Sequence, residues 1–97
     1  MSEVLNPVAN RFTSGATLTH ESAKAALDAG LSRIAAGATE VDCAPLTQFD
    51  SSALAVLLAW QRAAAARGAA RGVVNLPSGL LSLARAYGVD TLLSFRH

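Results

Sequence analysis

Apolar residues recur at intervals of three and four in the first half of the chain, which is the spacing of one face of a helix. We therefore predict a helix over residues 20–36, with Thr19 as its cap and Gly37 as its end. The side chains expected to face the core are Ala23, Leu27, Leu31 and Ile34. Lys24 and Asp28 lie four positions apart outside this stripe and are expected to form a weak ion pair.

The longest apolar run, residues 53–60, lies in a second predicted helix that begins after Asp50 and ends near Gly68. The Asp50 carboxylate stands where it can accept the unpaired N–H groups of the first helical turn. One stripe of this helix is bulky and is expected to be buried: Leu54, Leu57, Leu58 and Gln61. A second stripe consists mostly of small side chains, which would let another backbone approach closely: Ser52, Ala55, Ala59, Arg62, Ala63 and Ala66.

Short extended segments separate these helices. We predict strands over residues 8–15, 40–44 and 73–76, a loop over 45–48, and an extended tail over 89–95. A third helix is predicted from Pro77 to Gly88, with a buried stripe of Leu80, Leu83, Ala84 and Tyr87. The alternation of strand and helix predicts an α/β fold, a small mixed β-sheet with crossover helices.

The chain of 97 residues is expected to form a single domain over residues 1–97, with 1–7 as a frayed or edge segment. It is 52% hydrophobic and 15% charged, which is typical of a globular domain. A net charge of +1 without a basic run argues against a nucleic-acid partner. We also see no signal peptide and no apolar run long enough for membrane insertion, so we expect a cytoplasmic protein.

Motifs for catalysis or metal binding are missing from the sequence. His20 and His97 are not at metal-ligand spacing with each other or with Cys43, which is expected to be a small core residue. Neither a phosphate-binding G-x-x-x-x-G-K loop nor a G-x-S-x-G elbow is present. We therefore expect no enzyme, no catalytic residue, no metal and no cofactor.

The remaining candidate is the group Asp50, Ser51 and Ser52 at the start of the second helix. Two interpretations stay open at this point. These residue types are the usual helix caps, so they could be capping residues only. Alternatively, the two hydroxyls beside the positive helix end and the small-residue stripe could form a regulated contact with another protein.

The stretch VDCAPLTQFDSSAL, residues 41–54, resembles the signature of STAS domains, named for sulfate transporters and anti-sigma-factor antagonists. In that family, a strand carrying an aspartate leads through a loop to Asp-Ser-Ser-Gly-Leu at a helix start. Ala53 stands where glycine is usual and is expected to place a methyl group near the serine. Residues 57–62 (LLAWQR) and 83–93 (LARAYGVDTLL) are similar to the small STAS subunit of the Mla phospholipid ABC transporter.

The resemblance implies a STAS fold and a non-catalytic cytoplasmic subunit, peripheral to the inner membrane through the transporter complex. Its partner would be the ATPase subunit, and indirectly the membrane permease, in a system that maintains outer-membrane lipid asymmetry. Ser51 matches the position that is phosphorylated in anti-sigma-factor antagonists, and it is the expected regulatory residue. The expected partner-binding residues are Asp50, Ser51, Ser52, Ala55, Ala59, Trp60 and Arg62.

An alternative function is an anti-sigma-factor antagonist that is regulated by phosphorylation at Ser51. Phosphate would add roughly −1.5 to −2 charges there and would block the surface for a partner. The sequence also leaves open whether two copies associate when the partner is missing.

Overall fold

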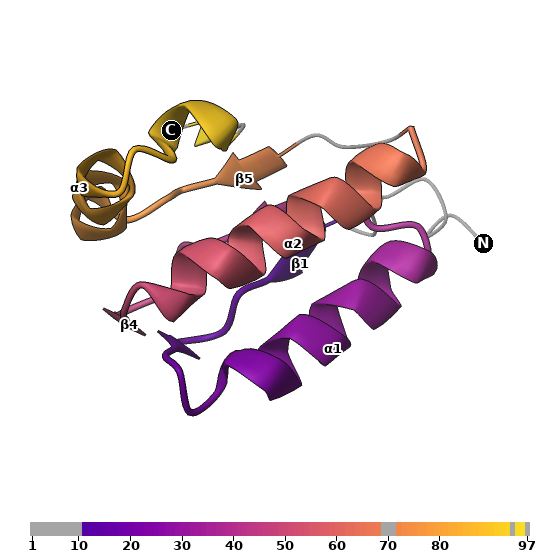
Figure 1. Ribbon diagram of the computed structural model, residues 1–97. Helices are drawn as coiled ribbons and strands as arrows, with labels where there is room; N and C mark the ends of the chain where they lie inside the picture. Colours follow the sequence, from indigo (N-terminus) through magenta and orange to yellow (C-terminus); the bar gives the residue numbers. More distant parts are fainter. Residues whose placement is uncertain (1–10, 69–71, 94, 97) are drawn as a thin grey trace.

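The computed structural model describes residues 11–68, 72–93 and the backbone of 95–96 (Figure 1). Residues 1–7, and residues 8–10 of the predicted first strand, lie outside the described residues. The elements in chain order are β1 (Arg11–Thr13), β2 (Thr17–Leu18), α1 (Ala23–Ala35), β3 (Glu40–Asp42), β4 (Gln48–Phe49), α2 (Ser52–Ala66), β5 (Gly72–Val74), α3 (Ser78–Ala86), the 3-10 helix η3 (Asp90–Leu92) and β6 (Phe95–Arg96).

Four of the strands form one sheet in the order β1-β3-β5-β6, and each neighbouring pair is parallel. In this sheet Phe12 lies opposite Val41, and Val41 lies opposite Val73, so a buried apolar row crosses the strands. All three crossovers between neighbouring strands run in the same direction across the sheet, from β1 to β6. The predicted α/β class is confirmed. The antiparallel strand that a mixed sheet requires is not among the described residues.

A second, two-stranded sheet pairs β2 with β4 in parallel. The loop predicted over residues 45–48 is therefore wrong at Gln48, which belongs to β4. Strands of two residues are too short to show alternation in a sequence, and their pairing partners lie far apart along the chain. This small sheet fixes the turn before α1 next to the start of α2, and Leu18 in β2 is fully buried beneath it.

Helix α1 begins at Ala23, three residues later than predicted. The residues before it form a separate turn, in which the Thr19 N–H donates to Ser22 Oγ and the Ser22 N–H donates to the Thr19 carbonyl, both at 3.0 Å. Within α1 the predicted Lys24–Asp28 ion pair is present, with Nζ and Oδ2 3.3 Å apart. The predicted buried stripe is also confirmed, since its four side chains pack into or against the core.

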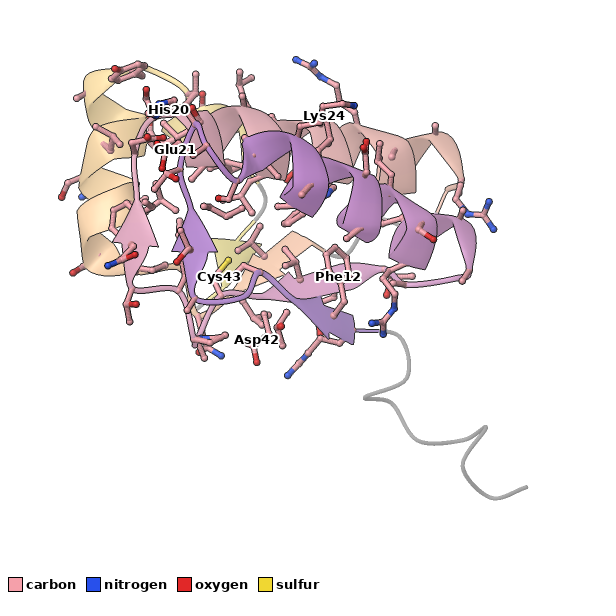
Figure 2. All side chains as sticks on the ribbon, turned by 90° about the horizontal axis from the view of Figure 1, so that it is seen from below. Phe12, His20, Glu21, Lys24, Asp42 and Cys43 are labelled. Atoms are coloured by element: carbon pink, nitrogen blue, oxygen red, sulfur yellow. The ribbon has the colours of Figure 1, made fainter. Side chains whose placement is uncertain are left out.

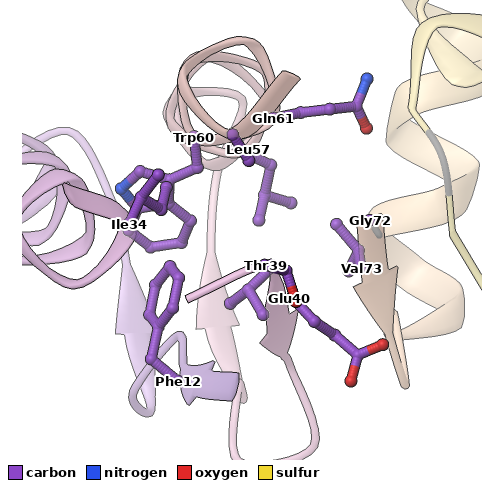
Figure 3. Close-up of a pocket in the computed structure, with 11 residues that line it drawn as sticks. Phe12, Ile34, Thr39, Glu40, Leu57, Trp60, Gln61, Gly72 and Val73 are labelled. Atoms are coloured by element: carbon purple, nitrogen blue, oxygen red, sulfur yellow. The ribbon is translucent and has the colours of Figure 1, made fainter. Parts of the chain in front are cut away.

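Trp60 joins α1 and α2 to the sheet (Figure 3). Its side chain is 3% exposed, its indole N–H donates to the Leu27 carbonyl at 3.2 Å, and its ring meets Phe12 edge-on at a centroid distance of 5.0 Å. Gly30 in α1 lies directly against the indole, where a methyl group would overlap the ring. The two helices therefore touch closely at this level because a glycine faces the largest side chain of the core.

The C-terminal part departs from prediction in two places. Tyr87 is 60% exposed rather than buried, because it comes after the last residue of α3, while Leu81 is buried instead. The tail predicted as extended over residues 89–95 contains the 3-10 helix η3, and the strand backbone starts only at Phe95. The Gln61 side-chain amide donates to the Leu92 carbonyl and ties η3 to α2.

Cys43 is a core residue, as predicted, with no exposed surface. Burial raises the pKa of its thiol to about 11, so the thiolate is disfavoured. Next to it, the Asp42 carboxylate accepts hydrogen bonds from the Asn75 amide and the Ala44 N–H, both at 2.9 Å. The Asn75 amide is the main reason that the pKa of Asp42 is lowered. This carboxylate joins the ends of β3 and β5 and has a structural role.

Candidate functional site

Asp50 makes the capping contact that the sequence predicts. Its Oδ1 accepts the N–H of Ser52, the first residue of α2, at 2.8 Å. Ser51 already has helical backbone angles, with φ −63° and ψ −19°. The carboxylate therefore satisfies one of the unpaired N–H groups at the positive end of α2.

The same carboxylate also reaches the segment before α1, where Figure 2 shows His20 and Glu21. Asp50 Oδ2 accepts the backbone N–H of His20 at 3.0 Å, and the His20 Nδ1 lies 3.4 Å away. The His20 N–H, and after it the Ser52 N–H, hold the pKa of Asp50 below its usual value. Asp50 thus links two segments 30 positions apart in sequence. Sequence reasoning missed His20 because this contact depends on the β2–β4 pairing.

Ser51 is exposed, and no described residue hydrogen-bonds its hydroxyl group. Ser52 is half-buried beside Asp50. Ala53 has no exposed surface, so its methyl group lies in the core and not on the outer surface around the serine, where it was expected. The Ser51 hydroxyl is therefore open to another molecule, and the methyl group of Ala53 does not cover it.

The side of α2 that faces away from the core carries small side chains, and it extends the surface around Ser51 along the helix. Ala55 is exposed and Ala59 is half-buried, while Arg62 is exposed one turn further on. Leu54 and Leu57 on the opposite side are in the core, as predicted. The assignment of Trp60 to partner binding is wrong, because its indole is enclosed by α1 and β1. Its spacing from Leu57 and Ala64 puts it on the buried stripe, and that was the signal available in the sequence.

The described residues contain no group of three histidine, cysteine, aspartate or glutamate side chains that could hold a metal ion. The site offers a carboxylate that is already hydrogen-bonded, one exposed hydroxyl group and a shallow apolar surface. These groups suit contact with another protein.

The parallel sheet, the crossover helices and the Asp-Ser-Ser turn at the start of α2 define an α/β domain of the STAS class. The chain matches the family model described as "Mlab, STAS domain" over residues 14–94. It therefore belongs to the MlaB-like STAS domains, and the predicted family is confirmed. A search of curated proteins and a search of solved structures each gave no match. None of the helices in the described ranges has the length and hydropathy needed to cross a bilayer.

Proposed function

We propose that this chain is the STAS subunit of an Mla-type phospholipid ABC transporter and that it binds the ATPase subunit through the start of α2. Its role would be to support the assembly or activity of the transporter, and so to help maintain the lipid asymmetry of the outer membrane. The observation that carries the proposal is the exposed Ser51 hydroxyl at the edge of a small-residue helix face, in a chain of the MlaB-like family.

The surface fits this role physically. Small side chains let a partner helix or loop approach the α2 backbone closely, and little side-chain entropy is lost at Ala55 and Ala59 when they are covered. Asp50 holds the end of α2 in place before any partner arrives. The proposed docking residues are now Asp50, Ser51, Ser52, Ala55, Ala59 and Arg62, without Trp60.

In this proposal the chain performs no catalysis itself. It is cytoplasmic and lies at the inner membrane only as part of the complex, where it contacts the permease indirectly. ATP binding and hydrolysis belong to its partner, and this chain acts through the shape and charge of its surface.

The test is co-purification and titration with the cognate ATPase subunit, using Ser51→Asp as the variant. The added carboxylate would lie next to Asp50 inside the interface, so we expect the affinity to fall about tenfold or more. Ser82→Asp, at an exposed serine of α3, is the matched control and should bind as the wild-type chain does. A folded Ser51→Asp variant that binds with unchanged affinity would remove Ser51 from the proposed site.

The alternative function, an anti-sigma-factor antagonist, keeps one supporting observation, which is the exposed hydroxyl of Ser51. It requires phosphate transfer to that hydroxyl by a partner kinase. Intact mass after incubation with the cognate kinase tests it, since an antagonist should gain one phosphate and its Ser51→Ala variant should gain none.

A further inference from the structure

A hollow of about 220 Å³ lies between β1 and α1, on the side of α1 that faces the edge of the sheet. Two aromatic side chains contribute to its lining, Phe12 of β1 and Trp60 of α2, and both are more than nine-tenths buried (Figure 3). The α1 side is lined by three small residues, Ala26, Ala29 and Gly30. A cavity of about 150 Å³ can hold a benzene ring, so this hollow has room for one apolar side chain.

The polar groups around the hollow do not oppose an apolar occupant. The Ser14 hydroxyl is buried but donates to the Gly15 carbonyl at 2.9 Å. Arg33 is exposed, so its guanidinium group can stay in water while its aliphatic stem packs over the opening. An apolar side chain can therefore enter without leaving either group unpaired.

The hollow borders one edge of the four-stranded sheet. β1 is the first strand in the order β1-β3-β5-β6, and among the described residues β3 is its pairing partner. The Ser14 N–H donates to the Asp42 carbonyl at 3.0 Å and so points toward β3. Backbone groups of successive residues point to opposite sides of a strand, so the N–H and C=O of Thr13 point away from β3. Such an edge is a template for a further strand.

We propose that residues 3–6 of the same chain return along this edge as an antiparallel strand and that Leu5 fills the hollow. Ten residues precede β1, and the chain leads from them directly into the edge strand at Arg11. Ten residues suffice for a hairpin in which four residues pair and four form the loop. This strand would complete the mixed sheet that the sequence predicts. The inference is independent of the proposed function.

Turn chemistry selects one register for this hairpin. Asn6 and Pro7 suit the first two positions of a type I turn, around which four-residue hairpin loops are most often built. A loop over residues 7–10 places Leu5 opposite Phe12. Directly opposed residues of antiparallel strands have their side chains on the same face of the sheet, and Phe12 faces the core. Leu5 therefore enters the hollow beside the Phe12 ring.

The same register gives Val4 a different environment. It lies opposite Thr13, whose outward N–H and C=O can pair with the Val4 backbone. The Val4 side chain shares the other face of the sheet with that of Thr13, which is exposed. Pro7 lies in the loop, where its missing N–H costs no ladder hydrogen bond.

The first test compares these two neighbouring side chains. Leu5→Asp would bring a carboxylate against the two aromatic rings, so we expect the urea midpoint of unfolding to fall by about 1 M or more. Val4→Asp is the matched control on the exposed face, and its shift should be less than half as large. Equal shifts for the two variants, or no shift for Leu5→Asp, would overturn the proposed register.

The second test needs no variant. In nuclear magnetic resonance spectra of the full chain, the Leu5 methyl protons should show Overhauser contacts to the ring protons of Phe12 and Trp60, and the Val4 methyl protons should show none. Absence of the Leu5 contacts would overturn the inference. In a mixture of labelled and unlabelled chains, contacts between different molecules would show that a second copy fills the hollow, and they would overturn it as well.

Discussion

The two ends of the α1–α2 pair show opposite ways of using small residues. Toward the C-terminal end, Gly30 on α1 faces Trp60 on α2, and the indole fills the space that the missing side chain leaves. Toward the N-terminal end, Ala23 and Ala55 line the two walls, and a groove of about 400 Å³ stays open between them. The space between these two helices is therefore filled at one end, the closed end, and empty at the other, the open end.

The difference shows that small residues do not by themselves mark a docking surface. A small residue opposite a large one allows close packing inside the chain. Both residues are then buried against each other and are not available to a partner. A small residue opposite another small one leaves space that a side chain of another molecule can enter. Changes of bulk or charge at each end should therefore have different effects on stability.

Removing the large residue should open the closed end. Trp60→Ala deletes the contact with Phe12, the hydrogen bond to Leu27 and most of the filling between the helices. We expect the free energy of unfolding to fall by about 3–5 kcal/mol, the usual range for such a deletion in a core. Urea unfolding followed by circular dichroism measures it. A loss below about 1 kcal/mol would mean that Trp60 does not hold the two helices together.

Adding one methyl group at the closed end should also lower the stability of the fold. Gly30→Ala raises helix propensity by about 1 kcal/mol, but the methyl group would overlap the Trp60 indole. We expect a net loss of about 1–3 kcal/mol in the free energy of unfolding, as for other overpacked cores. Ser32→Ala, at an exposed position of α1, is the control for propensity and should not destabilise.

The clash also predicts a coupling between the two residues. Gly30→Ala should cost much less in a Trp60→Phe background, because the smaller ring leaves room for the methyl group. Equal costs in both backgrounds would show that the destabilisation comes from somewhere other than the indole contact.

At the open end, the link made by Asp50 should depend on pH. The His20 and Ser52 N–H groups lower its pKa in the folded chain below the ordinary value of 3.8. A lowered pKa means that the stabilisation is present above the unfolded pKa and is lost as the pH falls through the folded one. The wild-type chain should therefore be more stable than Asp50→Asn at neutral pH, and this difference should vanish in acid. A difference in urea midpoint that stays constant across the titration would contradict the role of the charge.

The smallest effect on stability is expected where bulk is added to the open end. Ala55→Leu places its side chain over the groove, where nothing in the described chain is displaced. Its free energy of unfolding should stay within about 0.5 kcal/mol of wild type, as is usual for surface changes. A loss as large as that of Gly30→Ala would show that the groove is already closed in solution, and the comparison between the two ends would fail.

The sequence predicted much of this architecture. The helical spacing of Leu54 and Leu57 indicated the buried side of α2, and the Asp50 carboxylate was placed at the correct helix end. The order of strands and helices gave the α/β class. These features depend on neighbours within a few positions, which is the range that periodicity and capping preferences report.

The features that the sequence did not predict depend on long-range contacts. The link between His20 and Asp50 follows from the β2–β4 pairing of two-residue strands, which leaves no periodic signal. Tyr87 has the spacing of a buried residue, but α3 ends just before it and the ring is exposed. The groove itself depends on how side chains of two helices meet, and no single helix shows this in its own sequence.

Hydrogen exchange of the chain, alone and saturated with the cognate ATPase subunit, tests the central claim most directly. We expect slower exchange in the complex for amides over residues 20–27 and 50–59, the two walls of the open end, with little change around Gly30 and Trp60. Protection confined to α3 and η3, with none at the start of α2, would contradict it.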